Sequence, residues 1–269
     1  TNTAKGIEFY GQSEMTLKAD HLTVNAIDDS QEEDTGVVGI SSQGNYNSSK
    51  HSFDLGEGSA ISASSKGGAV GFVGVNTDLK ASNLAVNVDS SKYAYGINAS
   101  NNSNIDLGTN SKIHANTLTG NDSYGVSLND HSSLTASNLT IDGGFVNGIM
   151  ADQSSINIDG GKIEAQKVGV SGDYTDIVLK NATINILNED AVPAGRDMYV
   201  GLSSWGGQVS VSNSTIHMTP KADGAIPVYG MYFGGSGQRD ISDVSIVSDA
   251  QGSSMGIFTD DAGDSTNLK

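Results

Sequence analysis

The sequence predicts an all-β protein, a right-handed parallel β-helix that forms a three-sheet solenoid of about ten rungs. Two patterns of spacing support this prediction. A glycine followed by an apolar residue recurs at intervals of 21 to 33 residues, and a second apolar pattern lies inside each interval. The composition is a third indication, because 34 glycines and a hydrophobic fraction of only 36% favour short strands and tight turns over helices.

The glycine–apolar repeat marks one strand in each turn of the predicted solenoid. Its apolar residue stands at Ile7, Ile40, Phe72, Ile97, Val126, Ile149, Val170, Leu202, Met231 and Ile257. The shortest intervals are 21 and 23 residues, enough for three short strands, and the longer intervals contain insertions. One turn of three strands cannot bury its apolar face alone, so successive turns must stack on one another.

The second pattern reads apolar, any, small or Asn/Asp, any, any, apolar, any, apolar. Its copies begin at Leu17, Leu79, Leu134, Ile158, Leu179, Val211 and Ile241, and the two copies from Leu55 and Leu107 carry one extra turn residue. Alternation with period two indicates strands with one buried face, and Gly, Asn, Asp and Ser accept the turns between them. A sandwich of hairpins is the competing fold, but it would show two-residue Asn-Gly or Asp-Gly turns and would not explain the minimum interval.

We expect residues 1–269 to form a single β-helix domain that is part of a longer protein. Most of the extra length falls after the third strand of a turn and before the next glycine. These loop insertions span 28–36, 89–95, 117–124, 188–199 and 219–229. They are expected at one corner of the solenoid, where insertions often mark a binding face, although corners also tolerate insertions without any function.

Charge and residue usage exclude several classes of protein. The net charge is −17, with 31 acidic and 14 basic residues, which disfavours nucleic acid as a partner. No apolar run approaches the roughly 20 residues of a membrane helix, so we expect no membrane insertion by this segment. The absence of cysteine excludes disulfides and zinc–thiolate sites.

Two of the insertions are rich in charged residues and are candidate ligand-binding loops. The first contains Asp28, Asp29, Glu32, Glu33 and Asp34, and the second contains Glu189, Asp190, Arg196 and Asp197. The first loop has the oxygen ligands that Ca²⁺ prefers, or it could meet a basic partner, but a solvated acidic loop is the favoured interpretation. A local salt bridge is the simpler account of the second loop. We therefore expect no metal or other cofactor.

Gly234-Gly235-Ser236-Gly237 is similar to one imperfect copy of the calcium-binding nonapeptide, a motif that works only by repetition.

Tyrosines near the repeat glycines are further candidates for ligand binding. Tyr95, Tyr124 and Tyr229 directly precede the glycine, and Tyr199 stands one residue earlier. An exposed row of aromatic rings could stack on sugar rings. Stacking of the tyrosines on one another, which buries area, is the favoured interpretation.

Catalytic signals are weak, and we expect no enzyme activity. The five histidines stand alone, without the spacing of a ligand pair. Asp78, Asp130, Asp152 and Asp176 are the carboxylates that could align in a groove, as a polysaccharide hydrolase or lyase requires. With two arginines and a net charge of −17, the chain would also repel polyanionic substrates.

In composition and periodicity, the chain resembles the passenger domain of a bacterial autotransporter of the adhesin type. Typical stretches are Tyr95-Gly96-Ile97-Asn98-Ala99-Ser100 and Ile105-Asp106-Leu107. The resemblance implies export across the outer membrane and display at the bacterial cell surface. It also fits the lack of cysteine, because a disulfide formed in the periplasm would hinder secretion.

From this resemblance we expect an adhesin that binds a host extracellular-matrix protein or a glycan, or that associates with the same protein on another cell in aggregation and biofilm formation. Binding would use polyvalent polar contacts from outward positions that repeat along the β-helix, such as Thr23, Asn87, Thr140, Asn185 and His217. The alternative is a polysaccharide-degrading β-helix enzyme, a hydrolase or lyase of the tailspike kind. A third possibility is a spacer that holds another domain away from the cell.

Overall fold

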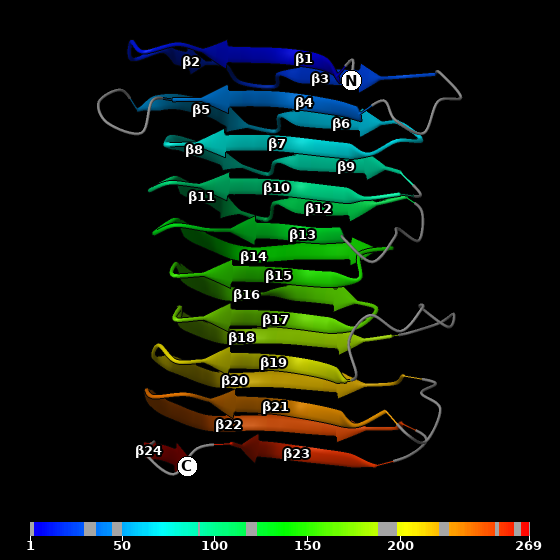
Figure 1. The fold of residues 1–269 in the computed structure, drawn as a ribbon, viewed down its shortest axis with the longest axis vertical. Coiled ribbons are helices and arrows are strands. Elements are labelled where there is room, and N and C mark those ends of the chain that lie inside the picture. Colours follow the sequence, from blue (N-terminus) through cyan, green and yellow to red (C-terminus); the bar gives the residue numbers. More distant parts are fainter. Residues whose placement is uncertain are drawn as a thin grey trace.

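The structure is a computed structural model, and it describes residues 3–29, 36–44, 50–90, 92–116, 123–187, 198–220, 226–250, 253–260 and 265–268. These residues form strands and turns and no helix, so the prediction of an all-β protein is confirmed. A helix long and apolar enough to cross a membrane is accordingly not found in the described ranges. The strands stack in layers from the N-terminal end to the C-terminal end (Figure 1).

One face of the stack is a ten-stranded sheet in which all the described strands pair in parallel. Its strands, in spatial order, are β1 (Thr3–Tyr10), β4 (Gly36–Gln43), β7 (Ala69–Val75), β10 (Ala94–Ser100), β13 (Ser123–Leu128), β15 (Asn147–Asp152), β17 (Val168–Asp173), β19 (Tyr199–Trp205), β21 (Val228–Gly234) and β23 (Ser254–Thr259). The ten apolar residues of the glycine repeat, from Ile7 to Ile257, pair with one another in a single row across this sheet. The repeat read from the sequence is therefore the register of the sheet.

The second sheet has fourteen strands and is also parallel. Ten of them follow one another in space: β2 (Thr16–Lys18), β5 (His51–Glu57), β8 (Thr77–Ser82), β11 (Asn104–Thr109), β14 (Ser133–Gly143), β16 (Ser155–Ala165), β18 (Asp176–Ile186), β20 (Val209–Met218), β22 (Gln238–Ser248) and β24 (Ser265–Leu268). The other four form a separate column that joins β14: β3 (Thr23–Ile27), β6 (Ala60–Ser64), β9 (Ala85–Asp89) and β12 (Lys112–Ala115).

The two halves of the chain therefore differ in how the predicted second and third strands are joined. In the N-terminal half these are separate strands, as expected. From β14 to β22 they form one longer strand that bends at a left-handed residue, such as Asn138 (φ 53°) or Asn181 (φ 52°). A single residue in this conformation bends a strand while its neighbours keep their ladder hydrogen bonds.

The register corrects the alignment of the second sequence pattern. Leu134 pairs with Ile156 and Ala136 pairs with Ile158, so the copy that begins at Ile158 is displaced by two residues from the copy that begins at Leu134. The same displacement separates the copies from Leu55, Leu107, Leu179, Val211 and Ile241 from those that begin at Leu17, Leu79 and Leu134. Side chains alternate with a period of two, so a displacement of two residues leaves the same kind of residue facing inward. The sequence pattern therefore looked the same in both registers.

The glycines of the repeat allow the two sheets to approach each other closely. A Cβ atom at Gly148 would lie 2.5 Å from the Cγ2 atom of Ile163, on the opposite sheet, and 2.5 Å from the carbonyl oxygen of Gly169, on the next strand. The same crowding recurs at every repeat glycine from Gly6 to Gly230, each against a valine or isoleucine of the facing strand. The interior is thus too narrow for any side chain at these positions.

A ladder of buried hydroxyl groups supports the corner where the first sheet turns into the second. The backbone N–H of Ser103 donates to Oγ of Ser132, that of Ser132 to Oγ of Ser154, and that of Ser154 to Oγ1 of Thr175, each at 3.2 Å. Each hydroxyl in turn donates to a carbonyl oxygen of its own turn, as Ser132 does to Asn129 at 2.7 Å. The ladder satisfies backbone groups that the sharp corner would leave unpaired inside the protein.

We expect Gly148→Ala to destabilise the fold by about 1–3 kcal/mol, because the new methyl group overlaps backbone and side-chain atoms that cannot both move away. Gly256→Ala is the matched control, since a Cβ atom there meets nothing within 4 Å. We expect the control to change the free energy of unfolding by less than about 1 kcal/mol in chemical denaturation. Equal effects of the two substitutions would contradict the proposed close approach of the sheets.

We expect Ser132→Ala to cost about 1–3 kcal/mol, because it leaves the buried N–H of Ser103 and the carbonyl of Asn129 without their partner. Ser133→Ala removes the same hydroxyl group from the next residue, whose side chain lies on the outer surface. It should change stability by less than about 0.5 kcal/mol. Thermal and urea unfolding of the two variants test the ladder, which is disproved if Ser132→Ala is as stable as Ser133→Ala.

Candidate functional site

The described strand ends that flank the five insertions lie at one corner of the stack. The third strands end there in register, with Ile27 beside Ser64 and Ser64 beside Asp89, and in the C-terminal half Ile186 lies beside Met218. The strands of the ten-stranded sheet begin at the same edge, on the right in Figure 1. The strands that the insertions connect thus end and begin at one corner, while residues 30–35, 91, 117–122, 188–197 and 221–225 of the insertions lie outside the described residues.

Most of the predicted charged site residues lie outside the described residues. This applies to Glu32, Glu33, Asp34, Glu189, Asp190, Arg196 and Asp197. Asp28 and Asp29 are described, directly after β3, and the backbone N–H of Asp28 donates to the carbonyl of Ser64 at 2.9 Å. Asp29 is exposed and Asp28 is partly exposed. The loops themselves therefore remain candidates on the strength of the sequence alone.

The predicted row of tyrosines is interrupted. Tyr95 and Tyr124 pair in register, and their rings pack at a tilt of 35° with centroids 5.2 Å apart. Tyr93 meets the ring of Tyr95 edge-on at 6.2 Å. The next residue in this row is Asn147, so the stack of rings ends after Tyr124.

Tyr199 does not belong to the outer row. It pairs with Val228, whereas its neighbour Val200 pairs with Tyr229, and its ring is only 3% exposed. Burial raises the pKa of the Tyr199 hydroxyl above its ordinary value of 10.0. A difference of one residue in the distance to the glycine puts a strand side chain on the opposite face of the sheet. Tyr199 is therefore a core residue.

Tyr229 belongs to a second aromatic cluster at the C-terminal end of the ten-stranded sheet. Its ring lies 5.4 Å from those of Tyr232 and Phe258, which stack on each other. The Tyr232 hydroxyl donates to Oδ2 of Asp260 at 2.8 Å. Burial and the hydrogen bond to the Asp260 carboxylate raise the pKa of Tyr232. The tyrosines thus pack mainly on other aromatic rings, in agreement with the favoured interpretation that they stack on one another rather than form an exposed row.

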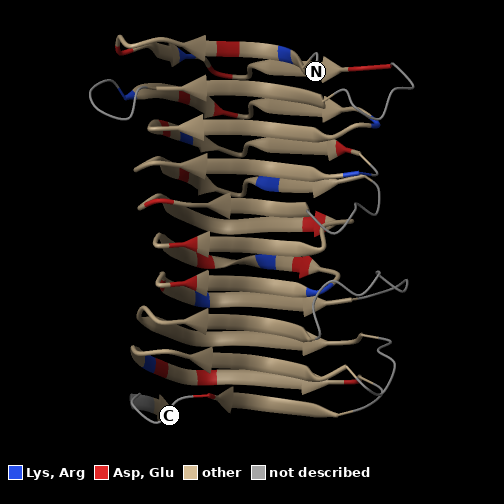
Figure 2. Cartoon of the chain, viewed as in Figure 1, with Lys and Arg blue, Asp and Glu red and all other residues tan. Residues whose placement is uncertain are grey.

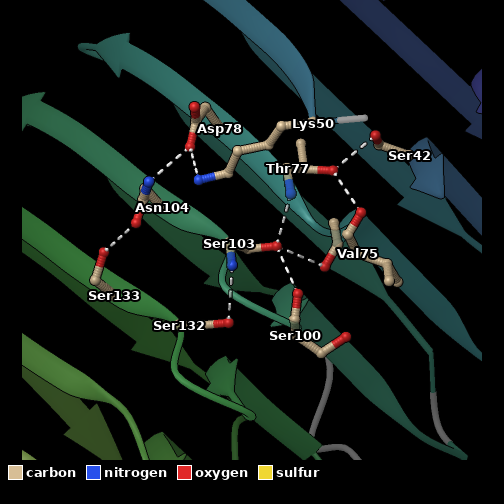
Figure 3. Close-up of polar contacts among 11 residues, drawn as sticks. Ser42, Lys50, Val75, Thr77, Asp78, Ser100, Ser103, Asn104, Ser132 and Ser133 are labelled. Atoms are coloured by element: carbon tan, nitrogen blue, oxygen red, sulfur yellow. Dashed lines mark hydrogen bonds and ion pairs between the residues drawn. The ribbon is translucent and has the colours of Figure 1, made fainter. Parts of the chain in front are cut away.

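Polar side chains form a continuous ladder on the outer face of the fourteen-stranded sheet (Figure 3). The Lys50 ammonium group contacts Oδ1 of Asp78 at 2.5 Å, and the Asn104 amide donates to the same oxygen at 2.7 Å. Ser133 then donates to Oδ1 of Asn104 at 3.1 Å. In the register, this row runs from Ser52 through these residues to Ser155 and Asp176. It presents alternating donors and acceptors to the solvent, one strand spacing apart.

The neighbouring row of the same face carries alternating charges in the N-terminal half. Lys18, Asp54, Lys80 and Asp106 occupy adjacent positions on successive strands. Opposite charges on neighbouring strands attract, so this row also supports the register. Across the whole stack, Lys and Arg are few and scattered, and no basic face is seen in this view (Figure 2).

The outward positions predicted on the third strands lie in two rows rather than one. Thr23 and Thr140 share the first row, with Ala60, Ala85 and Lys112 between them. Asn87 lies in the neighbouring row beside His114, and further along this side Asn185 pairs with His217. The two-residue displacement of the sequence pattern explains why Asn185 and His217 do not share the row of Thr140, whereas Asn87 stands two residues beyond Ala85, the residue of its own strand in that row.

A small ionic network occupies this surface. Asp142 receives hydrogen bonds from Nδ1 of His114 at 2.5 Å and from Nζ of Lys112 at 3.0 Å. Burial raises the pKa of the Asp142 carboxyl, but the hydrogen bonds and charges of His114 and Lys112 outweigh it, so the pKa lies below 3.8. Asp142 therefore stays ionised and fixes both basic side chains on the surface.

Two of the four carboxylates considered for catalysis, Asp78 and Asp176, do not meet in one groove, and a third, Asp152, pairs with Asp173 on the next strand of the ten-stranded sheet. Asp78 and Asp176 lie in the same row, but the three strands between them carry Asn104, Ser133 and Ser155. This separation of about 19 Å exceeds the roughly 5–9.5 Å between the carboxylates of glycosidases. Asp130 lies in a turn, with φ 53°.

The ranges described contain no group of three or more side chains placed to hold a metal ion. In the glycine-rich turn at 234–237, the carbonyl oxygens of Gly234, Gly235 and Gly237 accept hydrogen bonds from Arg239, a buried residue. These oxygens hold a guanidinium group, which accounts for the turn without calcium.

Comparison with known proteins gives no match to a family model, to a curated protein or to a solved structure.

We expect Asp142→Asn to lower stability at neutral pH by less than about 1 kcal/mol, the range for partly exposed ion pairs. Because the folded-state pKa of Asp142 lies below the unfolded value of 3.8, its contribution is complete above that pH and disappears as the pH falls through the folded-state pKa. The stability gap between wild type and variant should therefore close as the pH falls from 6 to below 3. Urea unfolding across this range checks it, and a gap that does not depend on pH would contradict the role of Asp142.

Proposed function

We propose that the chain is a right-handed parallel β-helix with three sides and about ten rungs, and that it acts as an adhesin on the bacterial cell surface. Support for the β-helix comes from the path of the chain, which runs from the ten-stranded sheet through the fourteen-stranded sheet and back, one layer further along. Support for adhesion comes from the outer face of the larger sheet. Its polar side chains repeat in register from strand to strand, over a length that no single small ligand would need.

The physical basis of the proposed adhesion is addition of many weak contacts. A neutral hydrogen bond contributes about 0.5–1.5 kcal/mol net, so one contact gives little affinity. Rows such as Asp78–Asn104–Ser133 place donors and acceptors at the strand spacing of about 4.8 Å, and many copies on one cell multiply their effect. The partner is a host matrix protein, a glycan or the same protein on another cell. The acidic surface makes nucleic acid an unsuitable partner.

The resemblance of the sequence to autotransporter passengers leads us to propose export across the outer membrane. A chain without cysteine, rich in short strands, and folded by adding one layer to the last suits secretion in an extended form. The alternative of a polysaccharide-degrading enzyme has less support, because the carboxylates Asp78 and Asp176 lie far apart on the surface.

The proposal is tested by display of the chain on a non-adherent laboratory bacterium. We expect Asp78→Ala/Asn104→Ala/Ser133→Ala to reduce attachment to immobilised matrix proteins or glycans, or cell aggregation, by roughly tenfold, as the loss of several weak contacts implies. The matched control is Gln43→Ala/Asn98→Ala/Ser203→Ala on the outer face of the ten-stranded sheet. It should adhere like wild type at equal surface expression.

Failure of the displayed wild-type chain to adhere to any surface or cell would contradict the proposed function. Release of reducing ends from neutral or acidic polysaccharides by the purified chain would favour the enzyme instead.

A further inference from the structure

Two large aromatic side chains are exposed at the corner between β17–β19 and β18–β20. Tyr174 is 65% exposed and Trp205 is 43% exposed, and Trp205 is the only tryptophan of the chain. The backbone N–H of Tyr174 donates to the carbonyl of Trp205 at 2.8 Å, so the two residues lie on neighbouring layers. Unlike Tyr95, Tyr124, Tyr229 and Tyr232, neither residue has a ring contact with another aromatic side chain of the described residues.

Both rings are held in place by glycines. A Cβ atom at Gly206 would lie 3.0 Å from Cδ1 of Tyr174, and one at Gly234 would lie 2.3 Å from Cε3 of Trp205. The turn beneath Trp205 is fixed from inside by Arg239, which donates to the carbonyl oxygen of Gly234 at 2.9 Å. The indole therefore rests on a rigid support, and its outer surface faces the solvent.

Tyr174 also has an unfavourable backbone conformation. Its φ is 49°, a left-handed value that a bulky residue rarely adopts. The residues that precede the hydroxyl ladder in other layers share this conformation but are Asn76, Asn102, His131 and Gln153, which are polar. An exposed aromatic ring at this position gives up stability without burying apolar area, which points to a role in binding.

A depression of about 210 Å³ adjoins the aromatic pair along the chain. It lies on the outer face of β18, β20 and β22, and its outward side chains are Asp176, Val178, Gln208, Ser210, Gln238 and Asp240. Tyr174 is two residues from Asp176, and Gly206, on which its ring lies, is two residues from Gln208.

The polar groups of the depression include several that are available to a ligand. Oδ1 of Asp176 accepts from the backbone N–H of Gln208 at 2.9 Å, and Oδ2 has no partner among the described residues. The side chains of Gln208 and Ser210 likewise form no hydrogen bond within the described part of the chain. Asp240, in contrast, accepts from Gln238 at 2.8 Å and from Asn267 at 2.9 Å. Carboxylate, amide and hydroxyl groups are thus presented together.

We propose that this corner binds a neutral, hydroxyl-rich oligosaccharide, with sugar rings against Trp205 and Tyr174 and hydroxyl groups bonded to Asp176, Gln208 and Ser210. The apolar face of a sugar ring suits an exposed aromatic ring, and its hydroxyls both donate to carboxylates and accept from amides. Asp176, Asp240 and the net charge of −17 repel an anionic glycan. The volume is below the roughly 300–1,000 Å³ of pockets that enclose a whole ligand, so one ring of a longer chain would occupy it.

The proposal deepens the adhesive function by naming a ligand class, and it rests on that function for its setting at the cell surface. Trp205 is a built-in probe, because its fluorescence reports directly on this corner. We would titrate the purified chain with cellohexaose, laminarihexaose, mannohexaose and chitopentaose, and measure Trp205 fluorescence together with calorimetry. At least one of these is expected to bind and to change the emission.

Three variants test the site, and each leaves Trp205 in place. Gln208→Ala and Asp176→Asn should each weaken binding roughly tenfold, and Gln43→Ala, an exposed glutamine on β4, should not. Tyr174→Asn installs the residue found at Asn76 and Asn102, so it should unfold at the same or a higher temperature and yet bind roughly tenfold more weakly. This variant separates loss of binding from loss of the fold. Trp205→Ala, measured by calorimetry alone, should lose most of the affinity.

Absence of binding to all four oligosaccharides would overturn the proposal, as would wild-type affinity in Tyr174→Asn, Gln208→Ala and Asp176→Asn. Tighter binding of a sulfated glycan or of an oligolysine peptide would overturn the assignment to neutral sugars. The same variants in the cell-attachment assay separate the two proposals. Sugar binding by a chain that confers no adhesion would contradict the adhesive function alone. Adhesion by a chain that binds none of the sugars would contradict the proposed sugar site alone.

Discussion

The close contact between the glycine column of one sheet and the branched side chains of the other is the constraint on which the structure depends. At Gly96, a Cβ atom would lie 2.1 Å from Cγ2 of Ile113 and 2.5 Å from the carbonyl oxygen of Gly125. Because protein interiors pack as densely as organic crystals, a contact this tight fixes the distance between the sheets in every layer. Layers that share this distance stack on one another, while the loops between them vary in length. This explains why the same glycine position recurs although the interval between repeats varies from 21 to 33 residues.

The corners impose a second constraint, which concerns the backbone. Each sharp turn takes strand N–H groups away from the sheets and into the protein, where an unpaired donor is costly. The chain meets this cost with a left-handed residue followed by a buried serine or threonine, as in Asn102-Ser103 and Gln153-Ser154. Near the C-terminal end, the turn groups that need partners are acceptors. The guanidinium group of Arg239 donates hydrogen bonds to three carbonyl oxygens of a glycine-rich turn. The buried side chains of Ser132, Thr175 and Arg239 thus pair with backbone groups at the turns.

The sequence predicted the features that repeat and missed the features that depend on geometry across layers. The row from Ile7 to Ile257 was found because the same glycine step recurs along the chain, and its register was correct at every position. The second pattern was displaced by two residues, since alternation alone cannot distinguish positions on the same face. Tyr199 was grouped with Tyr95, Tyr124 and Tyr229, although the one-residue difference in its distance to the glycine puts its side chain on the opposite face of the strand. The buried role of Ser132 was missed, although a serine or threonine after a turn residue in successive layers is a signal that the sequence contains.

Where one layer departs from the repeat, the packing that maintains the repeat does not explain the residue found there, so another role must be sought. The hydroxyl ladder runs as far as Thr175, and the next layer has Gly207 there, where a Cβ atom would lie 2.2 Å from the carbonyl oxygen of Thr175. At the same place the polar turn residue is replaced by Tyr174, and Trp205 lies exposed on the adjoining layer. These changes give up a buried hydrogen bond and add backbone strain, so packing does not account for them. The polar rows repeat from layer to layer, so they suit contacts that any layer can make. The arrangement of Tyr174 and Trp205 occurs once among the described layers. Recognition of one particular ligand requires such a unique arrangement.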